Sequence, residues 1–188
     1  MEYVEDRPVD EETESAVSVR LLRGRDVPRG PALQHTHAMW REFERADLRG
    51  MDLQGADLWS AHLQQADLQG AVLRGADLGQ SDLRDANLRD AKLQGARLWN
   101  ANLQRANLQD ADLRQAQFPD ADLRHSNLRG ANLYRANLRH AMLDGADLSD
   151  AWLWGAKLED VIYDEHTKWP EGFDPPPPER ALGAKRRA

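Results

Sequence analysis

The 188-residue sequence contains no cysteine. A disulfide framework, a thiolate nucleophile and a cysteine-based metal site are therefore excluded. Aromatic residues make up only 6% of the chain, and its acidic N-terminus carries no long apolar run. Such a start is not typical of a secretory signal or of a membrane span. We therefore expect a cytoplasmic protein that does not enter a membrane.

Positive charge is also in deficit. The chain has 32 Asp and Glu against 25 Lys and Arg, which gives a formal net charge of −7. This balance is mild evidence against nonspecific binding to nucleic acid, so no direct nucleic-acid binding is expected. The length fits one domain with tails.

A five-residue pattern occupies residues 46–160. Every fifth residue from Leu48 to Leu158 is Leu, except Phe118, and the phase holds through all 23 units. The residue two places before is Ala in all units but three (Met51, Ser81 and Ser126). The other positions are mostly Asp, Asn, Arg, Gln and Gly.

A period of five fits neither a helix nor a straight strand. On a helix, successive Leu side chains would rotate by about 140° and form no apolar stripe. On a strand, Ala46 and Leu48 share a face, but Leu53 lies an odd number of residues further on and points the other way. The conflict disappears if each unit is a very short strand followed by a bend. The pattern therefore predicts a coiled solenoid with Ala and Leu inside, so Leu103 faces inward and Gln104 outward.

An internal duplication indicates how many units close one coil. The segment that starts at Ala56 (Ala-Asp-Leu-Trp-Ser) resembles the segment that starts at Ala96 (Ala-Arg-Leu-Trp-Asn), forty residues later. Forty residues are two coils of four units but no whole number of three-unit coils. Gln and Arg also alternate at twenty-residue steps after the Leu, as in Gln64, Arg84 and Gln104. We therefore expect four sides.

The tandem Ala-(Asp/Asn)-Leu-x-x units resemble the pentapeptide repeat family over 115 of the 188 residues. The resemblance implies an all-β fold: a right-handed quadrilateral β-helix whose interior is lined by the central Leu and the Ala two places before it. At four units per turn, the repeats give about six coils.

The flanking segments predict caps and tails. Pro31 and the apolar residues after it favour a short helical cap that closes the first coil. Trp169 and Phe173 are expected to cap the last coil. The expected parts are an acidic, mostly disordered tail (1–30), an N-terminal cap (31–45), the β-solenoid (46–160), a C-terminal capping segment (161–174), and a Pro-rich spacer with a flexible basic tail (175–188).

Outward aromatic residues are the candidate partner-binding residues, because such residues are enriched at interfaces. Trp59 and Trp99 lie on one side, two coils apart, and Tyr134, Trp152 and Trp154 lie on the adjoining side. For the second group the alternative is that the rings pack beneath the C-terminal segment. For both groups, the rings could simply cover the rod.

No catalytic residue, metal or cofactor is expected. The six His are scattered along the chain, and His62, His125 and His140 occupy outward positions on different coils. Zinc needs ligands that converge on one point. The Asp residues are similarly dispersed. Three functions are considered, an interaction or scaffold module, a DNA mimic and an enzyme, and the enzyme is the least favoured.

The second hypothesis comes from the family resemblance. Some pentapeptide repeat proteins are acidic rods, dimerised through a C-terminal helix, that imitate DNA and bind type II topoisomerases such as DNA gyrase. Here the side centred on Leu48 has six outward acids against three Arg, a net charge of −3. The sides centred on Leu53, Leu58 and Leu63 have net charges of +2, −2 and −1. A DNA mimic needs a broad anionic surface. We therefore favour a rigid scaffold or interaction module, a monomer or weak dimer, that binds an unidentified protein partner.

Overall fold

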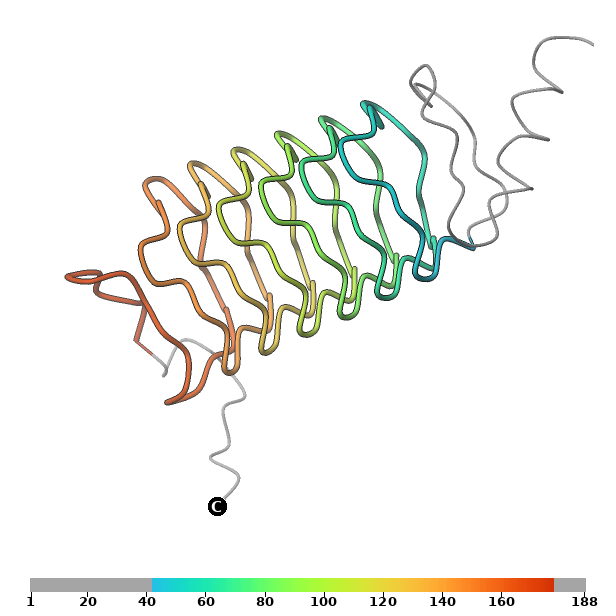
Figure 1. Ribbon diagram of the computed structural model, residues 1–188. Helices are drawn as coiled ribbons and strands as arrows, with labels where there is room; N and C mark the ends of the chain where they lie inside the picture. Colours follow the sequence, from blue (N-terminus) through green and yellow to red (C-terminus); the bar gives the residue numbers. More distant parts are fainter. Residues whose placement is uncertain (1–41, 178–188) are drawn as a thin grey trace, which may run out of the picture.

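The computed structural model describes residues 42–177, which wind into a rod of stacked coils (Figure 1). Each five-residue unit contributes one isolated bridge residue and a two-residue turn. Within 42–177 no residue lies in a helix or in a strand longer than one bridge residue. The short strands expected from the sequence are thus reduced to single bridges, because the chain turns again after every unit.

Parallel bridges join each coil to the next in a twenty-residue register. They run from Glu42–His62 to Met142–Ile162 without a break in phase. Around one bridge, the Leu103 amide donates to the Asp122 carbonyl at 2.7 Å, and amides of the following coil donate back in the same way. A step of twenty residues is four units per coil, as the internal duplication suggested.

Every turn places its last residue in the left-handed region. At each fifth position from 45 to 160 the φ angle is positive, between 51° and 71°, and the next amide donates to the carbonyl three residues back, as Ala46 does to Phe43 at 3.0 Å. Only eight of these positions are Gly. The rest are polar residues. Several of them are Asp or Asn, such as Asp90 and Asn100, which tolerate this conformation better than most residues do. Stacking of the coils therefore sets the backbone even where the residue disfavours it.

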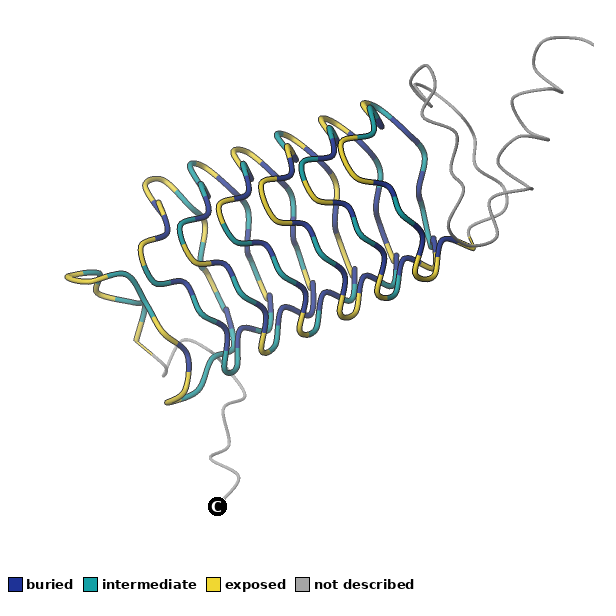
Figure 2. Cartoon of the chain, viewed as in Figure 1, coloured by how far each residue is buried: buried dark blue, intermediate teal, exposed yellow. Residues whose placement is uncertain are grey.

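The interior is filled by the repeated Leu and Ala. Figure 2 shows that buried positions recur on every coil. From Leu63 to Leu148 the central side chains have no solvent exposure, and Phe118 fills its place without shifting the phase. Where Ser replaces Ala, at Ser81 and Ser126, the buried hydroxyl donates to the carbonyl three residues earlier at 2.7 Å. These two substitutions therefore leave no unsatisfied polar group in the core.

The ladder begins before Ala46. Glu42 bridges His62, and Phe43 is buried with its amide donating to the His62 carbonyl at 2.8 Å. The Phe43 unit, assigned to the cap from sequence, is therefore built like a repeat. The expected acidic tail, the helical cap up to Arg41 and the end of the basic tail lie outside the described residues.

Past Asp160 the chain follows the ladder and then departs from it. Ile162 pairs in the twenty-residue register, whereas Asp147 pairs with Lys168, which is one residue further. The extra residue is accommodated by a turn in which the buried Thr167 hydroxyl donates to the Leu143 carbonyl at 2.8 Å.

The end of the described chain folds back across the last coil. Trp169 lies edge-on to Tyr163 and stacks on Phe173, with ring centroids 5.3 and 5.5 Å apart. All three rings pack against the core, and the Tyr163 hydroxyl donates to the Pro176 carbonyl at 2.7 Å. Trp169 and Phe173 are thus placed where a cap would lie.

Candidate partner-binding surface

Trp59 and Trp99 form one pair, although two coils separate them. Gly79 lies between them, and a Cβ atom there would clash with the Trp59 ring. The ring of Trp59 therefore occupies the space that a side chain at Gly79 would need. It meets Trp99 edge-on, with centroids 4.7 Å apart. Trp59 is partly buried as a result, and Trp99 is 39% exposed.

The second aromatic group is far more exposed. Trp152 and Trp154 are each 70% exposed, and Trp154 stacks on Tyr134 with centroids 5.4 Å apart and planes inclined by 13°. The bridge Asn132–Trp152 places these residues on adjacent coils. We name Tyr134, Trp152 and Trp154 the aromatic cluster.

The described C-terminal segment leaves the aromatic cluster open. Trp154 borders a shallow hollow shared with Pro170 and Phe173, yet most of its surface remains accessible. Residues 161–177 therefore do not bury the tryptophans of the cluster, which was the alternative left open by the sequence. Two large apolar side chains so exposed on a rigid surface are a candidate contact site.

Polar side chains between coils form a recurring set that sequence reasoning did not find. A Gln donates to an Asp eighteen residues later, and the Arg two residues after that Asp forms an ion pair with it. The three sets are Gln64–Asp82–Arg84, Gln94–Asp112–Arg114 and Gln104–Asp122–Arg124. The alternation of Gln and Arg at twenty-residue steps was the available signal. Gln104, which the sequence places on the outside, is therefore hydrogen-bonded to Asp122.

Asp122 is the most enclosed of these carboxylates, with 12% of its side chain exposed. Burial raises the pKa of Asp122, but hydrogen bonds from Arg124 and Gln104 outweigh it and hold the pKa below the ordinary value of 3.8. A carboxylate whose pKa is lower in the folded protein than in the unfolded chain stabilises the fold at pH values above its unfolded-state pKa. This contribution is lost as the pH falls through the folded-state pKa.

Asp122→Asn is expected to lower the free energy of unfolding at pH 7 by about 1–2 kcal/mol, as loss of a charged hydrogen bond does. Between neutral pH and about pH 3 the variant should also lose less stability than the parent, because it lacks one titrating carboxylate. Urea titrations of both proteins across this range provide the measurement. Asp120→Asn, which replaces an exposed carboxylate, is the control. A parent and an Asp122 variant with the same acid dependence would contradict the assignment.

Ion pairs also neutralise most acids on the acidic sides. Arg105 pairs with Asp85 at 2.7 Å and Arg139 with Glu159 at 2.7 Å, both between successive coils. Within one unit, Arg49 lies 2.6 Å from Asp47 and its pKa is raised by that carboxylate. The surface therefore presents bonded pairs rather than a run of free carboxylates.

The geometry of repeating units agrees with the sequence comparisons. A family model described as pentapeptide repeats, in eight copies, matches residues 42–80, 81–118 and 116–155. The chain belongs to the pentapeptide repeat family. A search of curated proteins found no match.

One solved pentapeptide repeat protein superposes well enough to share this architecture. HetL from the cyanobacterium Nostoc sp. strain PCC 7120, a protein involved in heterocyst differentiation regulation, is 32% identical, with 68% of each chain covered and a TM-score of 0.58. The alr5209 protein of Nostoc PCC 7120 is 37% identical over 71% of this chain and 78% of its own, with a TM-score of 0.21. QnrB1, a plasmid-mediated fluoroquinolone resistance protein, is 16% identical over 66% and 87%, with a TM-score of 0.35. The last two superpose too poorly to inform this surface.

Residues 42–177 contain no cluster of three or more His, Asp or Glu that could hold a metal ion. A search of the same residues found no helix long and apolar enough to cross a membrane. The hollow beside the last coil is lined both by apolar residues, Leu158, Val161 and Phe173, and by charged ones, Lys157, Glu159, Asp160 and Asp174. Glu159 is ion-paired to Arg139.

Proposed function

We propose that this pentapeptide repeat protein is a non-catalytic interaction module. In this proposal a right-handed, four-sided β-helix of about six coils holds the aromatic cluster rigidly against a protein partner. The observation that carries it is the 70% exposure of both Trp152 and Trp154 beside the stacked Tyr134. Large aromatic side chains held in one geometry are the usual anchors of protein interfaces.

The backbone supports this role because a docking surface that is already ordered loses little entropy on binding. The rings of the aromatic cluster lie on residues whose backbone is fixed by the ladder on the preceding coil. The relative HetL is described as involved in regulation, and a role in binding another protein is consistent with that description.

The topoisomerase-binding DNA mimic receives less support. Such a mimic needs exposed carboxylates spaced like phosphates. Among the described residues, Asp82, Asp85, Asp112 and Asp122 are each ion-paired to Arg, and Asp147 is paired to Lys168. The pairing leaves few carboxylates available to a DNA-binding groove.

The test compares affinity capture from a host lysate by the wild-type chain and by a variant with Trp152→Ser and Trp154→Ser. A partner held by the cluster should bind the purified variant more weakly by over about 2 kcal/mol, roughly thirtyfold, in calorimetry. Because both side chains are exposed, the variant should unfold at nearly the wild-type temperature.

Asp47→Asn, Asp67→Asn and Asp147→Asn together form the opposing variant. They lie on the most acidic side and should change the affinity of that partner little. If they abolish binding while the Trp variant retains it, and the wild-type chain inhibits DNA gyrase supercoiling, the mimic is correct and the aromatic proposal is wrong.

A further inference from the structure

Most basic side chains of the described repeats are ion-paired, and three of the four exceptions lie on one side. Of the fifteen Lys and Arg in residues 42–177, eleven lie within 4.0 Å of an acidic oxygen. Within this range the remaining four are Arg74, Lys92, Arg135 and Lys157. The first three belong to the side whose units are centred on Leu53, Leu73, Leu93, Leu113, Leu133 and Leu153, which we name the basic side.

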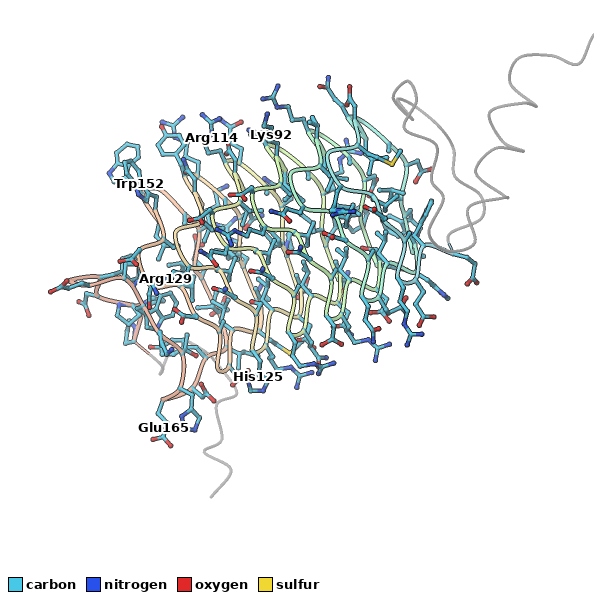
Figure 3. The ribbon with its side chains drawn as sticks, in the orientation of Figure 1. Lys92, Arg114, His125, Arg129, Trp152 and Glu165 are labelled. Atoms are coloured by element: carbon cyan, nitrogen blue, oxygen red, sulfur yellow. The ribbon has the colours of Figure 1, made fainter. Side chains whose placement is uncertain are left out.

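The three cations follow the length of the basic side. Val72 bridges Lys92, so Arg74 and Lys92 lie on adjacent coils, and Arg74 donates only to the neutral Gln94 at 3.0 Å. Figure 3 shows Lys92, Arg114 and Trp152 along one edge of the rod, with His125 on the opposite edge. Arg114 is ion-paired to Asp112, so it adds no free charge.

Arg135 connects the cations to the aromatic cluster. Its guanidinium lies over the Tyr134 ring, 5.0 Å from the centroid, and Tyr134 stacks on Trp154. The Arg135 side chain passes so close to Gly155 that an added Cβ would lie 3.2 Å from its Cγ. Because Gly155 has no side chain, there is space for Arg135 to stack on the Tyr134 ring. Through Arg135, the positive charge of the basic side therefore adjoins the aromatic cluster.

The flanking sides limit the shape of any anionic ligand. The basic side has two outward acids against four Lys and Arg, whereas the sides next to it carry net −3 and −2. A wide polyanion laid on the basic side would reach the acids of both neighbours, within the range where charges still repel. A single extended chain can keep its charges over the Lys and Arg of the basic side, farther from those acids.

We propose that the basic side binds an extended acidic segment of a protein, with Arg74, Lys92 and Arg135 facing its carboxylates and the aromatic cluster holding its apolar or aromatic residues. The inference rests on the proposed function, because it names the kind of protein partner that the module takes. A single-stranded nucleic acid is the competing occupant, since it also combines negative charge with stacking bases.

The experiment measures fluorescence anisotropy of a fluorescein-labelled peptide made of Glu and Tyr, titrated with the full chain. The test variant carries Arg74→Gln, Lys92→Gln and Arg135→Gln. The control carries Arg84→Gln, Arg105→Gln and Arg124→Gln, which are ion-paired on the opposite side. Both variants lose the same net charge, so an effect of overall charge would weaken both alike. Circular dichroism checks that both remain folded.

We expect the wild-type and control proteins to bind the peptide, the test variant to bind at least about tenfold more weakly, and added salt to weaken binding. Equal losses in the two variants, or no binding to wild type, would overturn the proposal. Tighter binding of labelled oligothymidine than of the peptide, lost in the test variant alone, would assign the side to single-stranded nucleic acid instead. If the peptide fails but the Trp152 and Trp154 variant still loses a captured partner, only this inference falls. If both fail, the proposed function falls too.

Discussion

Leu103→Ala is expected to lower the free energy of unfolding by about 2–5 kcal/mol. Leu103 is fully buried near the middle of the rod, and the coils before and after it hold the backbone through its amide and the neighbouring Asn102 amide. Because these ladders prevent the coil from collapsing inward, the lost volume should remain as a cavity. Stability in a repeat array depends on contacts between neighbours, so the loss should spread to the adjoining coils. Urea titration followed by circular dichroism gives the measurement.

The matched surface variant is Gln69→Ala. Gln69 also follows a central Leu, but it is exposed, and its replacement should change stability by less than about 0.5 kcal/mol. Gln104, which follows Leu103 directly, is a poorer control position, because its amide donates to Asp122 at 2.7 Å. Similar losses for Leu103→Ala and Gln69→Ala would show that the inside and outside positions are wrongly assigned.

Truncation after Asp160 is expected to convert the protein into oligomers or aggregates. It removes Trp169 and Phe173 from the core surface and the carbonyls of Ile162 and Lys168, which accept the Leu143 and Leu148 amides. The truncated end then exposes apolar surface together with unpaired backbone groups, which template association with another chain. Light scattering at increasing protein concentration should show a rising mass.

A second truncation, after Pro177, is the control. It keeps the whole described C-terminal segment, including the Tyr163 hydrogen bond to Pro176, and should scatter light like the full chain. A truncation after Asp160 that stays monomeric and folded would show that residues 161–177 are dispensable as a cap.

The repeat could be derived from the sequence because it is local and unbroken. A Leu at every fifth position is compatible with one inward direction only if the chain bends once per unit, and the forty-residue duplication points to four units per coil. Phe118 and Ser81 keep the phase, so neither obscures it. The burial of Leu103 and the outward position of Trp99 follow from the same reasoning.

The contacts between outward side chains were harder to predict. The sequence placed Trp59 and Trp99 on one side but two coils apart, and only the structure shows Trp59 passing over Gly79 to reach Trp99. It placed Arg135 and Tyr134 next to each other without indicating that the guanidinium stacks on the ring. Such contacts depend on which way a long side chain turns along the rod, and the five-residue pattern does not specify that direction.

The sequence by itself determined the phase of the coils, the residues of the core and the net charge of each side. A strict period fixes these because every unit must bury the same two positions. Only the tertiary structure decided which charges remain unpaired, since the pairs join residues either within one unit or about twenty apart, and side-chain conformation decides which partner is reached. It also decided that residues 161–177 leave the aromatic cluster open, because the extra residue before Lys168 and the path of the chain up to Pro177 are set by packing on the last coil.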